Sequence, residues 1–224
     1  MRVIFIIAAA GALFAAGTFD ITAYGAKGDG ATLDTIAIQK AVDAAADAGG
    51  GSVLFPNGRY LSGSIVLKSK VTLFITPGAA VIGSTNLQDF PTGRLIHARG
   101  VSDISIEGGG VIDGQGDTFW KKNDKAYSGE PWRGTAQFNY TAQKRPQFIH
   151  LERSTNIIIR SITLTNSASW TVHVQRCANV LAENVTIRNC LYGPNTDGFD
   201  INSCIDVMIR DCDIITGDDG IVLK

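Results

Sequence analysis

The chain has 224 residues, of which 45% are hydrophobic and 18% are charged, and its formal net charge is -1. This composition excludes a disordered chain, and the nearly neutral charge argues against nonspecific binding to nucleic acid or to acidic membrane surfaces. The length is enough for one substantial hydrophobic core, so a single folded domain is expected over residues 18–224.

Residues 1–17 have the pattern of a secretory signal peptide. Met1 and Arg2 are followed by an almost wholly apolar run over 3–14 and by small residues at 15–17. A membrane anchor is the alternative, but the run is too short to span a bilayer comfortably. We therefore expect a secreted protein, extracellular or periplasmic if bacterial, whose mature form has no membrane segment.

One helix is predicted next. Asp34 can cap a segment that runs to Asp47, and three glycines at 49–51 end it. Its apolar residues lie mostly on one side and are Ile36, Ile38, Ala41, Val42 and Ala45. Because the repeats that follow predict a solenoid, whose open end needs a cover, we expect this helix to be the N-terminal cap.

Internal repeats decide the predicted fold. Three similar segments begin at Ser154, Cys177 and Cys204, and looser copies lie at 70–82 and 102–113. Each alternates β-branched and polar residues, which predicts short strands that bury a core only when successive copies stack. No helical segment separates the copies, and the leucine-rich repeat signature is absent. The sequence therefore predicts an all-β solenoid, a parallel β-helix.

Stacking makes specific predictions about side chains. Ile157, Val180 and Val207 hold the same place in successive copies, so they should align along one face. Polar residues that end the strands should form ladders at the turns, namely Asn156, Asn166, Asn179, Asn189 and Asp206. The segment 114–144 lacks the repeat and carries Trp120, Tyr127 and Trp132, so we expect a long loop on the side where function lies.

Four cysteines lie in the second half of the chain, at Cys177, Cys190, Cys204 and Cys212. Their spacings match no zinc pattern. Export permits disulfides, and the equivalent places of Cys177 and Cys204 in adjacent repeats make that pair the candidate. A ladder of buried free thiols is the alternative.

Two acidic motifs near the C-terminal end carry the predicted chemistry. Asn195–Gly198 contains Asp197, and Gly217–Gly220 contains Asp218 and Asp219, about one coil later. The glycines can kink the chain so that both consecutive acids face one cleft. Crowded carboxylates raise the proton affinity of at least one, which suits acid/base cleavage of a glycosidic bond. The alternative roles for these carboxylates are solvated caps of turns and ligands of a calcium ion.

These motifs and the coil pattern resemble glycoside hydrolase family 28, the polygalacturonases and their relatives. The resemblance extends over nearly the whole mature chain and includes residues 19–29, 34–39, 50–56, 112–116, 145–146 and 166–170. It implies a right-handed parallel β-helix that cleaves α-1,4 links between galacturonic acids with inversion. It assigns Asp218 as the proton donor, Asp197 and Asp219 as the carboxylates that activate water, and Asn195 as their support.

The resemblance also implies a pectic polysaccharide or oligogalacturonide as the substrate, no metal or other cofactor, and a monomer. The family pattern continues with a Gly-His-Gly motif and an Arg-x-Lys motif that binds the substrate carboxylate, and this chain contains neither. We therefore expect a β-helix truncated at its C-terminal end, whose 224 residues alone have little or no activity.

Other histidines and basic residues lie outside the two acidic motifs. His97, His150 and His173 precede the acidic motifs and are assigned to surface or turn positions. Arg133, Arg145 and Lys224 are candidates to contact uronate, although residues of these types are more often structural or solvated. Two other functions remain alternatives: a pectate lyase, which uses calcium and a basic residue, and a noncatalytic solenoid that binds glycan or serves as an adhesin.

Overall fold

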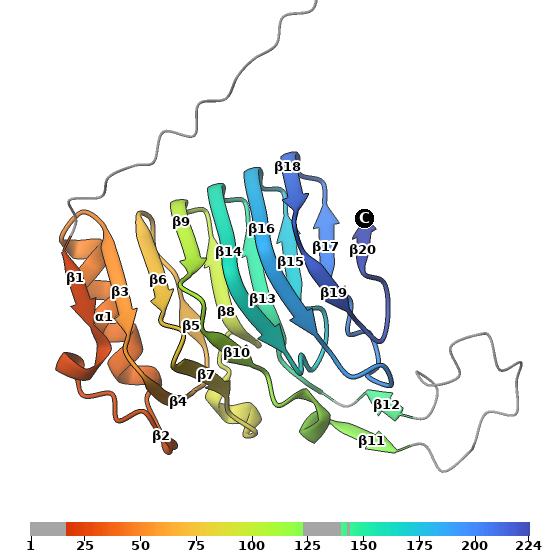
Figure 1. The fold of residues 1–224 in the computed structure, drawn as a ribbon, viewed down its shortest axis with the longest axis horizontal. Helices are drawn as coiled ribbons and strands as arrows, with labels where there is room; N and C mark the ends of the chain where they lie inside the picture. The colour runs from red at the N-terminus through yellow and green to blue at the C-terminus, as the bar shows by residue number, and fades with distance from the viewer. Residues whose placement is uncertain (1–16, 123–139, 143) are drawn as a thin grey trace, which may run out of the picture.

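The computed structural model of the protein describes residues 17–122, 140–142 and 144–224. Residues 1–16 of the predicted signal peptide lie outside the described residues, as do Tyr127, Trp132 and Arg133. Within them the chain forms a parallel β-helix whose successive coils stack side by side from the N-terminal to the C-terminal end (Figure 1). This confirms the fold predicted from the repeats.

Each complete coil contributes strands to three faces. The first face holds β1 (Thr18–Asp20), β3 (Gly51–Phe55), β6 (Val71–Ile75), β9 (Ser102–Glu107), β18 (Ile205–Arg210) and the first halves of β14 (Thr155–Thr165) and β16 (Ala178–Arg188). The second holds β2 (Asp29–Leu33), β4 (Gly58–Ser62), β7 (Ala79–Gly83), β10 (Val111–Asp113), the second halves of β14 and β16, and β19 (Asp213–Ile215).

The third face carries the side chains of the candidate site. It is built from β5 (Ile65–Val66), β8 (Arg94–Arg99), β13 (Gln147–Glu152), β15 (Val172–Gln175), β17 (Phe199–Asn202) and β20 (Ile221–Leu223), all paired in parallel. Apart from the three faces, β11 (Trp120–Lys122) and β12 (Tyr140–Ala142) form an antiparallel pair in the segment expected to be a loop. The described residues also form three 3₁₀ turns: η1 (Ile21–Tyr24), η2 (Leu87–Asp89) and η3 (Gly116–Phe119).

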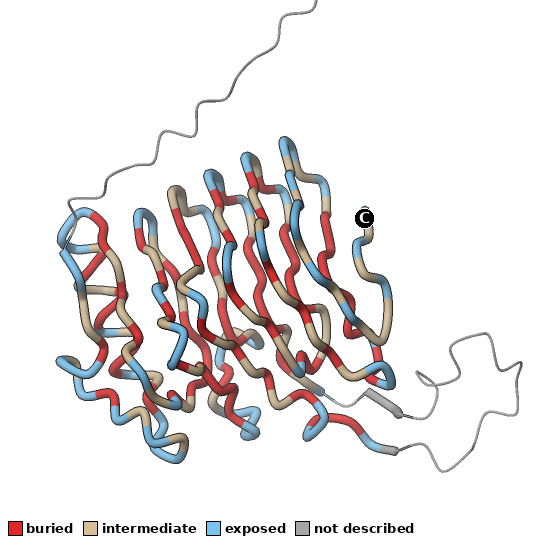
Figure 2. Tube along the Cα trace, viewed as in Figure 1, coloured by how far each residue is buried: buried red, intermediate tan, exposed pale blue. Residues whose placement is uncertain are grey.

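The core is a set of aligned columns of inward-facing residues. Ile157 pairs with Val180 and Val180 with Val207, as the repeat alignment predicts. Buried and more exposed residues alternate along β14 and β16, whereas most residues of the third-face strands β13, β15 and β17 are buried (Figure 2). Alternation therefore buries one side chain in two, and stacking gives each buried one a neighbour above and below.

The helix α1 (Thr35–Asp47) lies at the N-terminal end, against β1 and β3 (Figure 1). Its buried residues are Ala37, Ile38, Ala41, Val42 and Ala45. Two details of the prediction are wrong. Ile36 is 71% exposed, because it lies outside the stripe that meets the coils. The Asp34 carboxylate makes no capping bond and instead accepts the backbone N–H groups of Lys27 (2.7 Å) and Gly28 (3.0 Å).

The predicted polar ladders form where the chain turns between faces. Asp103, Asn156, Asn179 and Asp206 all have φ between 54° and 59°, a left-handed conformation that Asn and Asp tolerate best among residues with a side chain. Asn179 Nδ2 donates to Asn156 Oδ1 (3.1 Å), and Asn156 Nδ2 donates to Asp103 Oδ1 (2.7 Å). The ladders therefore supply hydrogen-bond partners to the Asn and Asp side chains that the left-handed turns favour.

The histidines do not occupy surface or turn positions. His97, His150 and His173 lie in β8, β13 and β15, in register with one another, and His150 and His173 are buried. The prediction was wrong because it considered each histidine alone, whereas the coils stack the three rings into one column.

The four cysteines are free thiols in the structure. Cys177 and Cys204 nevertheless lie on neighbouring coils, and the Cys177 N–H donates to Cys204 Sγ at 3.3 Å. Among the described residues, no helix is long and apolar enough to cross a membrane.

Candidate active site

The two acidic motifs form neighbouring turns at the edge of the third face. Asn195–Gly198 leads into β17 and Gly217–Gly220 leads into β20, and the Gly198 N–H donates to the Asp219 carbonyl at 2.8 Å. A Cβ atom on Gly198 would lie 2.3 Å from the Gly220 carbonyl oxygen. Only glycine therefore lets the two turns approach this closely.

Buried hydrogen bonds hold one motif against the other. The Thr196 hydroxyl donates to the Gly193 carbonyl (3.1 Å) and accepts the Gly217 N–H (3.0 Å), and this side chain is fully buried. Asn189 Nδ2 donates to the Thr196 carbonyl (3.2 Å), so this buried member of the predicted ladders supports the site. Thr196, between Asn195 and Asp197, thus fixes the distance between the motif that carries Asp197 and the motif that carries Asp218 and Asp219.

The three predicted acids come together. Asp197, Asp218 and Asp219 each offer one carboxylate oxygen, and these three oxygens all lie within 4.8 Å of one another. Asp197 is buried, Asp218 is half-buried and Asp219 is exposed, so the group extends from the core of the turn to the surface. The chain bends at Gly217 and Asp218 and has no strand there, as the flanking glycines predict.

Asn195 links the acids to a basic residue. Its Nδ2 donates to Asp218 Oδ2 (3.4 Å), and its Oδ1 accepts a hydrogen bond from Arg145 Nη2 (2.9 Å). Asp218 Oδ1 accepts the Asp219 N–H (3.0 Å). Both oxygens of Asp218 therefore have a donor, which orients this carboxylate.

Crowding and burial change the acidity of Asp197. Burial, followed by the charges of Asp200 and Asp218, raises the pKa of Asp197 to about 6, against an ordinary value of 3.8. The nearby Lys224 opposes this effect, with its Nζ 3.7 Å from Asp197 Oδ2. The carboxyl that crowding makes more basic is therefore Asp197, one of the two that the resemblance assigns to the water.

Asp200 is a fourth acid of the site that the sequence interpretation missed. It is fully buried, and burial raises its pKa although its partner Lys224 lowers it. Lys224 Nζ lies 2.7 Å from Asp200 Oδ1 and 3.7 Å from the centroid of the Trp170 ring. The ammonium group thus joins a buried carboxylate to an aromatic face.

The histidine column continues directly into this acid. His150 pairs with His173 and His173 with Asp200, and the rings of the two histidines stack with centroids 4.4 Å apart. The pKa of each imidazole falls to about 4, chiefly because of burial, and Lys224 also lowers that of His173. These rings are therefore neutral near pH 7 and stack in the coil next to Asp200.

A signal for these missed residues existed in the sequence. His150, His173 and Asp200 are separated by the same two intervals, 23 and 27 residues, that separate ladder partners in successive coils. Strand alternation also places Asp200 on the face opposite Phe199 and Ile201, which are buried in the core. The neighbouring coils, rather than the local motif, identify these positions.

The three acids also form a set of hard oxygen ligands that could hold a divalent cation. Lys224 already supplies positive charge to this group, at 3.7 Å from Asp197. The geometry also suits crowded carboxylates that divide a proton between them.

Comparisons with known proteins identify the family. The model described as glycosyl hydrolases family 28 matches residues 51–224. A Vitis vinifera protein with the name "Probable polygalacturonase" is 35% identical over 90% of this chain and 43% of its own length. An exopolygalacturonase structure from Thermotoga maritima superposes with a TM-score of 0.78 and 25% identity, covering 93% of this chain and 54% of that one.

A second solved structure, a family 28 exopolygalacturonase from Yersinia enterocolitica, gives a TM-score of 0.76 and 26% identity over 92% of this chain and 44% of its own. The chain spans less than half the length of the Vitis vinifera relative named above. The matched residues include both acidic motifs and every strand from β3 onwards. The chain belongs to glycosyl hydrolases family 28.

Proposed function

We propose that the protein hydrolyses α-1,4 links between galacturonic acid residues in pectin, as a polygalacturonase. The observation that carries the proposal is the approach of Asp197, Asp218 and Asp219 to within 4.8 Å on neighbouring coils of a family 28 chain. Two of the named relatives are exopolygalacturonases with the same fold. The substrate is a pectic polysaccharide or oligogalacturonide, and the protein acts as a monomer outside the cell after loss of residues 1–17.

In the proposed mechanism Asp218 is the general acid. Asn195 and the Asp219 N–H orient its carboxyl group, which gives its proton to the glycosidic oxygen as the bond to the anomeric carbon breaks. Asp197 and Asp219 hold a water molecule, take its proton and direct its oxygen to that carbon from the opposite side. Attack from the opposite side inverts the configuration.

The test is an assay of polygalacturonate with the protein expressed from its complete gene, using a neutral α-1,4 glucan as the control substrate. We expect new reducing ends from polygalacturonate only, without an unsaturated ultraviolet-absorbing product and with no effect of a chelator. Proton NMR of the first product should show the β-anomer. An unsaturated product or chelator-sensitive cleavage would instead indicate a lyase, and binding without cleavage would indicate a noncatalytic solenoid.

A further inference from the structure

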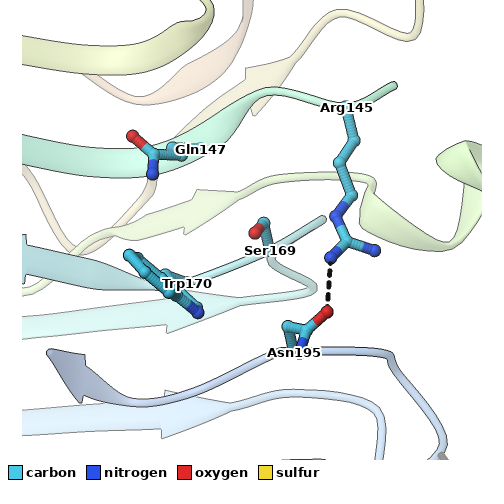
Figure 3. A pocket seen from close by; sticks show the side chains of 5 residues that line it. All are labelled: Arg145, Gln147, Ser169, Trp170 and Asn195. Atoms are coloured by element: carbon cyan, nitrogen blue, oxygen red, sulfur yellow. Dashed lines mark hydrogen bonds between the residues drawn. The ribbon is translucent and has the colours of Figure 1, made fainter. Parts of the chain in front are cut away.

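A polar pocket of about 260 Å³ opens at Asn195 (Figure 3). It is lined by Arg145, Gln147, Ser169, Trp170 and Asn195. Gln147 begins β13, Ser169 and Trp170 precede β15, and Asn195 precedes β17, so three successive coils contribute to it. Asn195 is shared with the acid group through its bond to Asp218, which places the pocket next to the reacting centre.

Arg145 is the cation of this pocket. Its Nη2 is held by Asn195 Oδ1, as the dashed line in Figure 3 marks, whereas Nη1 is buried and has no hydrogen-bond partner among the described residues. Burial lowers the pKa of the guanidinium, and the charge of Asp197 opposes this effect. No ion pair of the described part of the chain includes Arg145.

This arrangement is costly unless an anion completes it. An amide oxygen accepts one hydrogen bond from Arg145 but does not neutralise its charge, and a half-buried cation normally has a partner of opposite charge. Lys224, by contrast, is already paired with Asp200 at 2.7 Å. Of these two cations beside the acids, Arg145 is therefore the one whose charge is left for a ligand.

We propose that Arg145 binds the carboxylate of a galacturonate residue next to the bond that is cleaved, and thereby sets the preference for free uronate over its methyl ester. A guanidinium presents its donors in a fixed plane that matches a carboxylate. The same side chain holds Asn195, which in turn donates to Asp218. Recognition of the carboxylate is thus coupled to the orientation of the proton donor. This inference rests on the proposed function.

The experiment compares trigalacturonate with its methyl ester as substrates of the protein expressed from its complete gene. The variants are Arg145→Gln, Arg145→Lys and, as a matched control, Arg153→Gln, which removes an exposed arginine paired with Glu152. We expect Arg145→Gln to raise KM for the acid by about tenfold or more and to leave KM for the ester nearly unchanged. The preference for the acid, measured as the ratio of kcat/KM values, then shrinks by a similar factor.

The variants distinguish ligand binding from support of Asn195. If Arg145 only supports Asn195, Arg145→Gln lowers kcat/KM for acid and ester by the same factor, which would overturn the proposal. Arg145→Lys keeps the charge but not the planar fork, so it should retain part of the preference for the acid. Should Arg145→Gln fail to fold, as judged by its thermal melt, the lysine variant carries the comparison, and an unchanged preference would contradict the proposal.

A binding measurement separates this inference from the proposed function. Calorimetry with trigalacturonate needs no turnover. If the wild-type protein binds but does not cleave, the proposed function is wrong, yet a loss of affinity by about tenfold in Arg145→Gln would still support Arg145 as the carboxylate site. Binding that Arg145→Gln leaves unchanged, or a wild-type protein that does not bind trigalacturonate, would overturn the inference.

Discussion

The most buried member of the acid group, Asp197, sets the expected pH dependence. A carboxylate that takes a proton from water must be ionised, and burial beside Asp200 and Asp218 raises the pKa of Asp197 to about 6. We predict that kcat/KM falls about tenfold per pH unit as the pH drops below about 6. Removing the charge of Asp200 in Asp200→Asn should move this limb to lower pH, as measured by pH–rate profiles. If the acidic limb of the kcat/KM profile lies at the same pH in the wild-type and Asp200→Asn proteins, the assignment of that limb to Asp197 is wrong.

The same shift predicts a cost in stability. The folded-state pKa of Asp197 lies above its ordinary value of 3.8, so between about pH 4 and 6 the folded protein holds a proton that the unfolded chain has released. Stability therefore falls as the pH rises through this window. We predict that Asp197→Asn increases the free energy of unfolding by on the order of 1 kcal/mol at pH 7 and changes it little below about pH 4. Urea denaturation at the two pH values tests this, and destabilisation at pH 7 would contradict it.

Residues with a local motif were predictable from the sequence, and residues defined by neighbouring coils were not. The motif spacing predicted that Asp197, Asp218 and Asp219 would meet. Asp200 and His173 carry no local motif; they lie in register on neighbouring coils, and the partner of Asp200 is Lys224, which follows β20 on the next coil. No single segment of the sequence contains that information.

At the scale of elements, the left-handed turns between strands should tolerate glycine better than alanine. Asn179 has a φ of 55°, where a Cβ atom costs about 1–2 kcal/mol unless a local hydrogen bond offsets it. We predict that Asn179→Ala lowers the free energy of unfolding by about 1–2 kcal/mol, and Asn179→Gly by less. Asn202→Ala, in the regular strand β17, is the matched control. Equal losses in the alanine and glycine variants would show that φ is not the cause.

The turn between β15 and β16, which carries Cys177, and the coil that follows also predict the state of the thiols. The structure has Cys177, Cys190, Cys204 and Cys212 as free cysteines, and burial raises the pKa of Cys177, which makes it unreactive. We predict that titration of the denatured protein finds four thiols. A count of two would show that Cys177 and Cys204, or another pair, form the disulfide considered from the sequence.

The sequence of helix α1 predicted most, but not all, of its buried residues. Its apolar pattern predicted a cap and four of its five buried residues, because spacing along a helix defines one face. Ile36 is exposed because only a narrow stripe of α1 meets the coils. The width of the buried stripe depends on the shape of the coils that α1 packs against. The sequence of the helix alone does not contain this information.

At the scale of the whole molecule, the interval between repeat copies in the sequence predicted which strands of successive coils pair. The regular copies after residue 154 predicted the register of β14, β16 and β18, and this register is confirmed. The looser copies at 70–82 and 102–113 include β7 and β10 of the second face, whereas β2, β4 and the strands of the third face lie outside the predicted copies. The faces form only when each coil closes on its neighbour, so they depend on contacts between coils more than on local sequence.

We propose that this stack places the proton donor of the reaction at Asp218. The most direct measurement is the kcat of Asp218→Asn in the protein expressed from its complete gene, together with its affinity for trigalacturonate. We predict that kcat falls by about 10² to 10⁴ while the affinity stays nearly unchanged, because Asn keeps the shape but has no acidic proton. Asp219→Asn should also be severe. Asp213→Asn, which removes only the exposed partner of Arg188, should retain nearly full activity. Full activity in Asp218→Asn would contradict the account.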